Sequence, residues 1–277
     1  MTAFTDSDYF RIEPCGPVIG AEISGIDLRN LPTGPVLGDL KRAFLDWKVL
    51  FFRGLDPTSK EHLDFARLWG EPIDFPTAEK ADLPEVIVIA HGPDSPASEN
   101  VWHSDVTYLQ TPSTASILRA VDLPPLGGDT LWSDMAAAYD GLPDDVKERV
   151  ENLTAVHDFL TRHAGRDSVR RSELSRDLFP QSDHPVVLVH PETGRRIIYV
   201  NRVYTREILG LTASENEELL ELLCSQASRP EYQCRFRWTP GAIAVWDNRS
   251  TQHYAVADYS PHRRVMERVT IAGVPKR

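Results

Sequence analysis

The sequence predicts a single α+β domain, mainly β with helical decoration, around a β-sandwich or jelly-roll core. Short strand-like segments dominate from residue 101 onward. Helical patterns gather on the N-terminal side and in insertions between the strands. No change of composition marks a boundary within residues 1–277, so we expect one domain.

The first hundred residues combine short strands with two helices. Gly20 and Gly25 punctuate the first strand-like segment. Thr58 and Glu61 have the spacing of a capping box, which predicts the start of the second helix. The predicted elements are, in order, short strands within 17–29, a helix at 37–47, a strand at 48–53, a helix at 59–69 and a strand at 85–90.

The rest of the chain has the pattern of strands interrupted by two longer helices. The segment 158–185 is charged, rich in serine and poorly periodic, and we expect it to form an insertion or lid. The predicted strands are 114–121, 129–132, 186–189, 196–200, 233–238, 242–246 and 264–272, and the predicted helices are 133–151 and 214–227.

The composition argues against several functional classes. A net charge of −11 disfavours nucleic acid, because binding to phosphates depends on Lys and Arg. Three scattered cysteines without a CxxC pair disfavour a disulfide framework or a cysteine zinc site. No apolar stretch approaches the roughly 20 residues of a membrane span. The N-terminus lacks the pattern of a secretory signal, so we expect a cytoplasmic protein.

The segment His103-Ser104-Asp105 is the first candidate for metal binding. If the segment is extended, alternation puts His103 and Asp105 on one face, where both can reach one ion. His62 and Asp64 have the same spacing, but they lie in a predicted helix, where residues two apart point roughly 200° apart. We therefore interpret His62 as a surface helix residue and exclude it as a ligand.

His253 is the candidate for the third ligand. It follows a buried strand and a polar turn, whereas the other histidines lie in loop-like or polar segments. Arg264 and Arg268 follow within a predicted strand and share one of its faces. Two guanidinium groups on one face require paired carboxylates or an anionic ligand. Two histidines and one aspartate would form a facial triad that leaves coordination positions open.

Four motifs in order resemble one known family. They are WHSDVTY, GGDTLW, WDNRSTQHYAVADY and RRVMERVTIAG, and the likeness runs from about Gly20 to Gly273. The chain resembles the taurine dioxygenase family, the taurine/2-oxoglutarate-dependent dioxygenases that also include alkylsulfatases and aryloxyalkanoate dioxygenases. The resemblance implies a double-stranded β-helix, a jelly-roll, cupin-like barrel with iron near one mouth.

The resemblance also implies the cofactors and the residues that bind them. It implies that His103, Asp105 and His253 bind Fe(II), with 2-oxoglutarate and O2 as cosubstrates. Thr130 and Arg264 match the groups that bind the distal carboxylate of 2-oxoglutarate. The residues that it places around the substrate are Arg268, Val106, Phe75, Phe159, Tyr204 and Trp246.

One departure from the family pattern bears on the substrate. Family members that take taurine have a His at the position of Phe75, where it helps to hold the sulfonate. They also have an Asn at the position of Glu99, and an inward-facing carboxylate there would repel a sulfonate. We therefore expect a small anionic organic substrate other than taurine: an alkyl sulfate, an alkylsulfonate or a carboxylate.

The implied reaction is hydroxylation coupled to the conversion of 2-oxoglutarate to succinate and carbon dioxide. Hydroxylation beside a sulfonate, sulfate or ether oxygen gives an unstable product, so C–S or C–O cleavage can follow. Three alternatives are a dioxygenase of the same fold for a biosynthetic acid, a zinc hydrolase with a His2Asp site, and a barrel that binds a small anion without catalysis. The family resemblance further suggests a homo-oligomer, a dimer or a tetramer.

Overall fold

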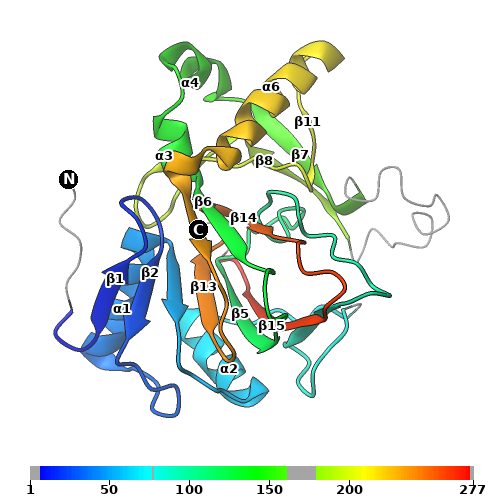
Figure 1. The fold of residues 1–277 in the computed structure, drawn as a ribbon. Coiled ribbons are helices and arrows are strands. Elements are labelled where there is room, and N and C mark those ends of the chain that lie inside the picture. Colours follow the sequence, from blue (N-terminus) through cyan, green and yellow to red (C-terminus); the bar gives the residue numbers. More distant parts are fainter. Residues whose placement is uncertain (1–6, 77, 161–178, 275–277) are drawn as a thin grey trace.

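The structure, a computed structural model, describes residues 7–76, 78–160 and 179–274 (Figure 1). The strands are β1 (Arg11–Pro14), β2 (Ala21–Ser24), β3 (Val49–Phe52), β4 (Ile87–His91), β5 (Ala115–Asp122), β6 (Thr130–Asp134), β7 (Thr154–Asp158), β8 (Gln181–Pro185), β9 (Val187–Val189), β10 (Arg196–Ile198), β11 (Thr205–Ile208), β12 (Gln233–Phe236), β13 (Ile243–Asp247), β14 (Thr251–Ala255) and β15 (Arg264–Ile271). The α-helices are α1 (Gly34–Trp47), α2 (Ser59–Ala66), α3 (Met135–Asp140), α4 (Asp144–Val150) and α6 (Ala213–Ser225).

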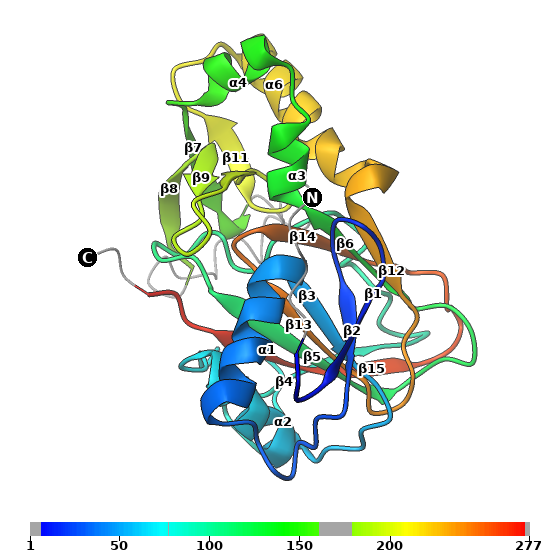
Figure 2. The same cartoon turned by 90° about the vertical axis from the view of Figure 1, so that its left-hand side faces the viewer.

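A mixed sheet in the order β1-β2-β3-β13-β5-β15-β4 forms the centre of the fold. Both of its faces are covered, which explains the continuous apolar sequence of β3. Leu50 and Phe52 pack against α1 and α2. Phe51 faces the opposite side of the sheet. Figure 2 shows the two helices lying against one side of this sheet. Each fully buried side chain of this size contributes roughly 1.5–3 kcal/mol of transfer free energy.

A second sheet in the order β12-β6-β14 packs against the other face. Aromatic side chains fill the space between the two sheets. The rings of Phe51 and Phe236 stack with centroids 4.1 Å apart, and Trp132 lies 5.3 Å from Phe51 and 5.7 Å from Trp246. These contacts fix the separation of β13 and β6, between which the candidate site lies.

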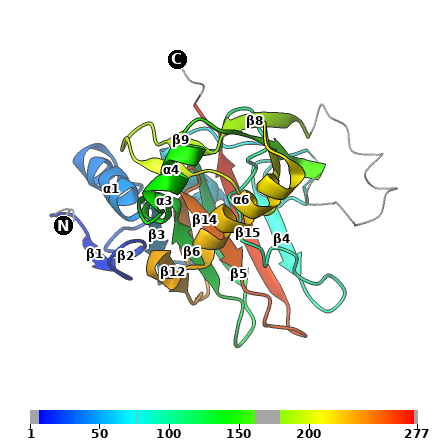
Figure 3. The ribbon, with the colours of Figure 1, turned by 90° about the horizontal axis from the view of Figure 1, so that it is seen from above.

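A third group of elements covers the far end of the second sheet. The helices α3, α4 and α6 share one apolar cluster with β9, β10 and β11, and the sheet β11-β7-β8 lies beside them. Figure 1 shows these helices together at the upper end of the molecule, and Figure 3 looks down onto them. Within the described ranges, no helix has both the length and the apolar character needed to cross a membrane.

The strand and helix predictions agree with the structure for most segments, and the fold is a mixed α/β arrangement of sheets and helices. The capping box of Thr58 and Glu61 is present at the start of α2. The predicted helix at 133–151 is wrong in its continuity, because a break at Gly141–Pro143 divides it into α3 and α4. The strands β1, β7, β8, β11 and β14 were not predicted.

The insertion expected at 158–185 is only partly described. Residues 161–178 lie outside the described ranges, so a lid there stays a prediction. The C-terminal end of the segment forms β8, which pairs with β7. This end therefore belongs to a sheet.

The interpretation of His62 as a surface residue is wrong. Its side chain is completely buried, because α2 lies against the large sheet and His62 is on the face that packs. Its Nε2 lies 3.3 Å from the carbonyl oxygen of Ile117, and its Nδ1 lies 3.8 Å from Glu267. His62 thus lies on the helix-covered side of the sheet, opposite the candidate site, and its exclusion as a partner of His103 stands.

Candidate metal centre and anion pocket

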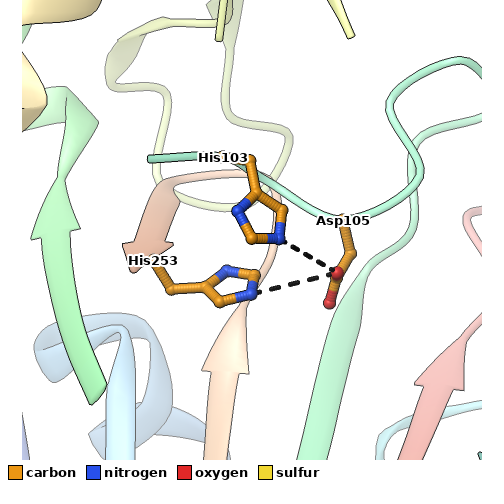
Figure 4. A group of neighbouring side chains, drawn as sticks. All are labelled: His103, Asp105 and His253. Atoms are coloured by element: carbon orange, nitrogen blue, oxygen red, sulfur yellow. Dashed lines mark ion pairs between the residues drawn. The ribbon is translucent and has the colours of Figure 1, made fainter. Parts of the chain in front are cut away.

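Three predicted ligands converge on one point between the two sheets (Figure 4). Nε2 of His103 and Nε2 of His253 each lie 3.9 Å from Oδ1 of Asp105. One ligand atom of each residue lies within 4.8 Å of the others, and all three residues are buried. Atoms at these distances are close enough for one cation to bridge them after small side-chain rotations.

Backbone pairing positions the two histidines. His103 and His253 form an antiparallel bridge, in which each donates its backbone N–H to the other's carbonyl oxygen, at 3.1 and 2.7 Å. Nδ1 of His103 donates to the carbonyl oxygen of Val101 at 2.7 Å, which places the lone pair on Nε2, the atom that faces Asp105. A histidine oriented by such a bond is ready to bind a metal through its other nitrogen. The residues present therefore fit a metal ion.

The expectation that His103 and Asp105 lie in one extended segment is wrong. His103 pairs with β14, but a turn begins at Asp105, and Val106 has a φ of +49°. A β-branched residue in the left-handed region costs on the order of 1–3 kcal/mol, so surrounding contacts must hold this conformation. The two side chains still converge, because the turn directs the carboxylate of Asp105 back toward the imidazole rings.

The electrostatic environment keeps Asp105 and His253 in the protonation states that a metal requires. Burial by itself would raise the pKa of the Asp105 carboxyl, but Arg268, His253 and His103 outweigh burial and lower this pKa to about 2. Burial, aided by the neighbouring ring of His103, lowers the pKa of His253 to about 3. At neutral pH the site therefore offers a carboxylate and a neutral imidazole.

Arg268 lies inside the site. Its Nη1 donates to Oδ1 of Asp105 at 2.7 Å, while the hydroxyl of Ser116 donates to Oδ2 at 2.8 Å. Arg268 also lines a cavity with His103, His253 and Trp246. A guanidinium at this place can hold an anionic group directly beside the metal ligands.

Arg264 lies deeper in the same cavity, and no carboxylate of the described residues forms an ion pair with it. Its Nε donates to the carbonyl oxygen of Gly128 at 3.0 Å, and its Nη2 lies 3.5 Å from the hydroxyl of Thr130. Burial lowers the pKa of this guanidinium. A buried cation of this kind fits an anionic ligand such as a carboxylate, and Thr130 is placed to share that ligand.

The GGDT motif has a steric role at this point. Gly128 has a φ of +72°, and a Cβ there would lie 2.9 Å from Cδ of Arg264. Gly127 has a φ of +84°, and its Cβ would meet Asp258 at 2.6 Å. Gly128 therefore lets the chain pass close to the Arg264 side chain, and Gly127 lets it pass close to Asp258.

Most of the other predicted substrate residues form an apolar wall next to the metal centre. Val106 and Tyr204 are buried members of one apolar cluster, and Phe75 and Phe159 pack against it. The fourth aromatic residue, Trp246, lies apart from them, with its ring 4.9 Å from that of His253. The structure thus divides the predicted site residues between the cavity that Arg264 and Arg268 line and an apolar wall.

Sequence reasoning missed Tyr108, which lies at the centre of the wall. Its ring lies 5.1 Å from that of Phe159 and 5.3 Å from that of Tyr204. Burial raises the pKa of its hydroxyl, and the charges of Arg268 and Asp105 also act on it. Its position in WHSDVTY, three residues after Asp105, was the signal that could have identified it.

Glu99 lines the same cavity as Arg264 and Arg268, and so does its partner His91. Nε2 of His91 lies 2.8 Å from a carboxylate oxygen of Glu99. The hydrogen bond to Glu99 raises the pKa of His91. An acidic group therefore faces the cavity at the position where family members that take taurine have an amide.

Among the histidines that the sequence placed in loop-like or polar segments, His157 and His190 are buried, as is His184. His157 lies in β7, with Nδ1 2.9 Å from the hydroxyl of Thr107. His190 lies 2.8 Å from the carboxylate of Asp247 through its Nε2. Neither joins the group of His103, Asp105 and His253.

Comparison with known proteins confirms the resemblance. Residues 11–270 match the family described as "Taurine catabolism dioxygenase TauD, TfdA family". The chain is 39% identical over 265 residues to an alkylsulfatase of Acinetobacter baylyi, covering 92% of this chain and 82% of that protein. It is 37% identical over 273 residues to an alpha-ketoglutarate-dependent sulfate ester dioxygenase of Pseudomonas putida, covering 95% and 89%.

A solved structure shows the same fold. The crystal structure of a taurine dioxygenase from Burkholderia xenovorans superposes with a TM-score of 0.83 at 36% identity, covering 96% of this chain and 90% of that chain. The sequence and structural matches agree over nearly the whole chain. The chain therefore belongs to the taurine catabolism dioxygenase TauD, TfdA family.

Proposed function

We propose that this protein hydroxylates an organic sulfate ester at the carbon next to the ester oxygen, so that the C–O bond then breaks. The reaction class follows from the family: the chain is a 2-oxoglutarate-dependent dioxygenase. The sulfate ester is proposed because two relatives that match nearly the whole chain are described as an alkylsulfatase and a sulfate ester dioxygenase. Alkylsulfonates and carboxylates, the other expected substrates, are also small organic anions.

The observation that supports this proposal best is the buried Arg264 beside the three converging ligands. In the proposal, His103, Asp105 and His253 hold iron(II), while Arg264 and Thr130 bind the distal carboxylate of 2-oxoglutarate. When bound, iron, 2-oxoglutarate and O2 supply the oxidation that places one oxygen atom in a C–H bond and leaves succinate and carbon dioxide. A zinc hydrolase would give no reason for a guanidinium to be buried in the cavity beside the metal centre.

The residues of this chain bind and orient the substrate. Arg268 is placed to hold the sulfate group, and its contact with Asp105 puts that group next to the metal centre. The wall around Tyr108 offers an apolar surface for the organic part of the ester. Arg268 would hold the anionic group, and the apolar wall would hold the alkyl or aryl group. The carbon between these two groups would then face the metal.

Several finer features belong to the same proposal. The two facing sheets would form the double-stranded β-helix of the family, with the metal centre near one mouth. Residues 1–277 would be one catalytic domain, with a lid within 158–185. We also keep the expectation of a cytoplasmic homo-oligomer, a dimer or a tetramer, that does not bind nucleic acid.

The proposal is tested by anaerobic spectroscopy followed by turnover. Iron(II) and 2-oxoglutarate together should give a visible charge-transfer band, and hexyl sulfate should then stimulate succinate release in air. His103→Ala should lose both signals, whereas His262→Ala should retain both, because His262 is exposed. A protein without the band is not a dioxygenase, and one with the band but no response to alkyl sulfates takes another substrate.

A further inference from the structure

Asn248 joins the turn at the metal centre to the turn between β13 and β14. The backbone N–H of Asp105 donates to Oδ1 of Asn248 at 2.8 Å, and Nδ2 of Asn248 donates to the carbonyl oxygen of Asp105 at 2.9 Å. Asn248 is fully buried and Asp105 is 2% exposed, so both bonds lie out of water. A side-chain amide has a donor and an acceptor side by side, and here they match both polar groups of one residue's backbone.

We propose that Asn248 is a positioning residue for the metal centre, which acts by holding the backbone of Asp105. The proposal rests on the proposed role of Asp105 as a metal ligand. Asn248 itself is not a ligand, because its side-chain nitrogen and oxygen are both engaged with the backbone of Asp105. The proposed ligands of the ion remain His103, Asp105 and His253.

The backbone of Asp105 needs such a partner because it lies outside every strand. Asp105 begins a turn, and Val106 follows with a φ of +49°. A buried N–H and carbonyl in such a segment require hydrogen bonds that no sheet supplies. Asn248 supplies both, and it does so at the residue whose carboxylate must point toward the histidines.

The turn that carries Asn248 is itself held rigidly. The backbone N–H of Asn248 donates to the carbonyl oxygen of Thr114 at 3.1 Å. The preceding carboxylate, of Asp247, accepts from Nε2 of His190 at 2.8 Å and from Nε and Nη2 of Arg249 at 2.9 and 2.7 Å. Asp247 is 1% exposed, so these charge-assisted bonds anchor the turn inside the protein.

The same turn also sets the position of His253. The turn leads directly into β14, which contains His253, and the hydroxyl of Ser104 donates to the carbonyl oxygen of Thr251 at 2.7 Å. The turn therefore connects the two ligands: Asn248 binds the backbone of Asp105, and the chain after the turn continues to His253. A substitution of Asn248 should change the distance between Asp105 and His253 and leave the sheets intact.

The test measures metal binding without turnover. Asn248→Ala removes both hydrogen bonds, and Asn248→Leu removes them while keeping a branched side chain with the same number of heavy atoms. Asn216→Ala is the matched control, because Asn216 accepts a backbone N–H, that of Ile208, at 2.7 Å far from the metal centre. For each protein we would measure the dissociation constant for Mn(II), the visible spectrum with Co(II), and the thermal unfolding of the metal-free form.

We expect both Asn248 variants to bind Mn(II) at least tenfold more weakly and to show a changed Co(II) spectrum, while Asn216→Ala stays within twofold of the unmodified protein. A folded Asn248 variant with unchanged affinity and spectrum would overturn the proposal. In the unmodified, metal-free protein the Asp105 amide should exchange slowly with solvent, and fast exchange would overturn it even if neither variant folds. An unmodified protein that binds no Mn(II) would instead refute the proposed function.

Discussion

Nη1 of Arg268 lies 2.7 Å from Oδ1 of Asp105, the oxygen that also lies 3.9 Å from Nε2 of both His103 and His253. The positive charge of Arg268 therefore reaches the oxygen on which the proposed metal ligands converge. A cation bound there and the guanidinium would share one carboxylate. Binding of a substrate anion to Arg268 would relieve the repulsion between them, so anion and metal should strengthen each other's binding.

Arg268→Ala should separate the binding of the substrate anion from the binding of the metal. Loss of the charge-assisted bond should lower kcat/KM for an alkyl sulfate on the order of 10²-fold, which corresponds to roughly 3 kcal/mol. Affinity for Mn(II) should stay the same or increase, because a neighbouring positive charge is removed. The control is Arg263→Ala, since Arg263 is exposed and lies just before β15, the strand that contains Arg268. Equal loss of metal binding and activity would show that Arg268 supports the ligands and does not hold the substrate.

Arg264→Ala should act on 2-oxoglutarate. Removing one partner of a buried charge pair costs about 3–5 kcal/mol, so the KM for 2-oxoglutarate should rise on the order of 10²-fold or more. The affinity for Mn(II) alone should change little. Arg235→Ala is the matched control, because Arg235 is 55% exposed and pairs with Asp129, the residue before Thr130. An unchanged KM in Arg264→Ala would exclude it as the carboxylate anchor.

The sequence indicated which residues lie close together, His103, Asp105 and His253, but not the path of the backbone between the first two. His103 and Asp105 were expected to meet through strand alternation, yet they meet because a turn at Val106 redirects the chain. No local pattern in WHSDVTY indicates that turn, since Val disfavours a positive φ. The hydrogen bonds that hold the backbone of Asp105 at this turn come from Asn248, which is distant in sequence.

The burial of His62 could not be predicted for a similar reason. The helical period correctly indicated that His62 and Asp64 point in different directions. It could not indicate which of the two faces the sheet, because a polar residue is usually placed in solvent. The partners that make its burial tolerable are Ile117 in β5 and Glu267 in β15, both far from α2 in the sequence.

Phe75→His should shift the choice of substrate. Phe75 packs against the apolar wall that contains Val106 and Tyr108, and an imidazole there would add a donor for a sulfonate. We expect kcat/KM to rise for short sulfonates such as taurine and to fall for hexyl sulfate, which loses apolar contact. Succinate release with both substrates measures the ratio, and Phe75→Leu serves as the apolar control. A ratio that is the same in both variants would place Phe75 away from the substrate.

His157 should make stability depend on pH. Burial, followed by the neighbouring His184, lowers its pKa from an ordinary 6.5 to about 3. Below pH 6.5 the unfolded chain then binds a proton that the folded protein does not bind. The free energy of unfolding therefore falls as pH falls from 6.5 toward 3, by at most about 1.4 kcal/mol per pH unit for this group.

His157→Gln should flatten that dependence. A glutamine amide can still bond to the hydroxyl of Thr107, which lies 2.9 Å from Nδ1 of His157, but it binds no proton in this range. Urea unfolding of the metal-free protein at pH 7.0, 6.0 and 5.0 measures the slope, and the exposed His262→Gln is the control. The slope should decrease in His157→Gln alone. Parallel slopes in all three proteins would mean that His157 takes up a proton in the folded state, either by charging in place or after a local opening of β7.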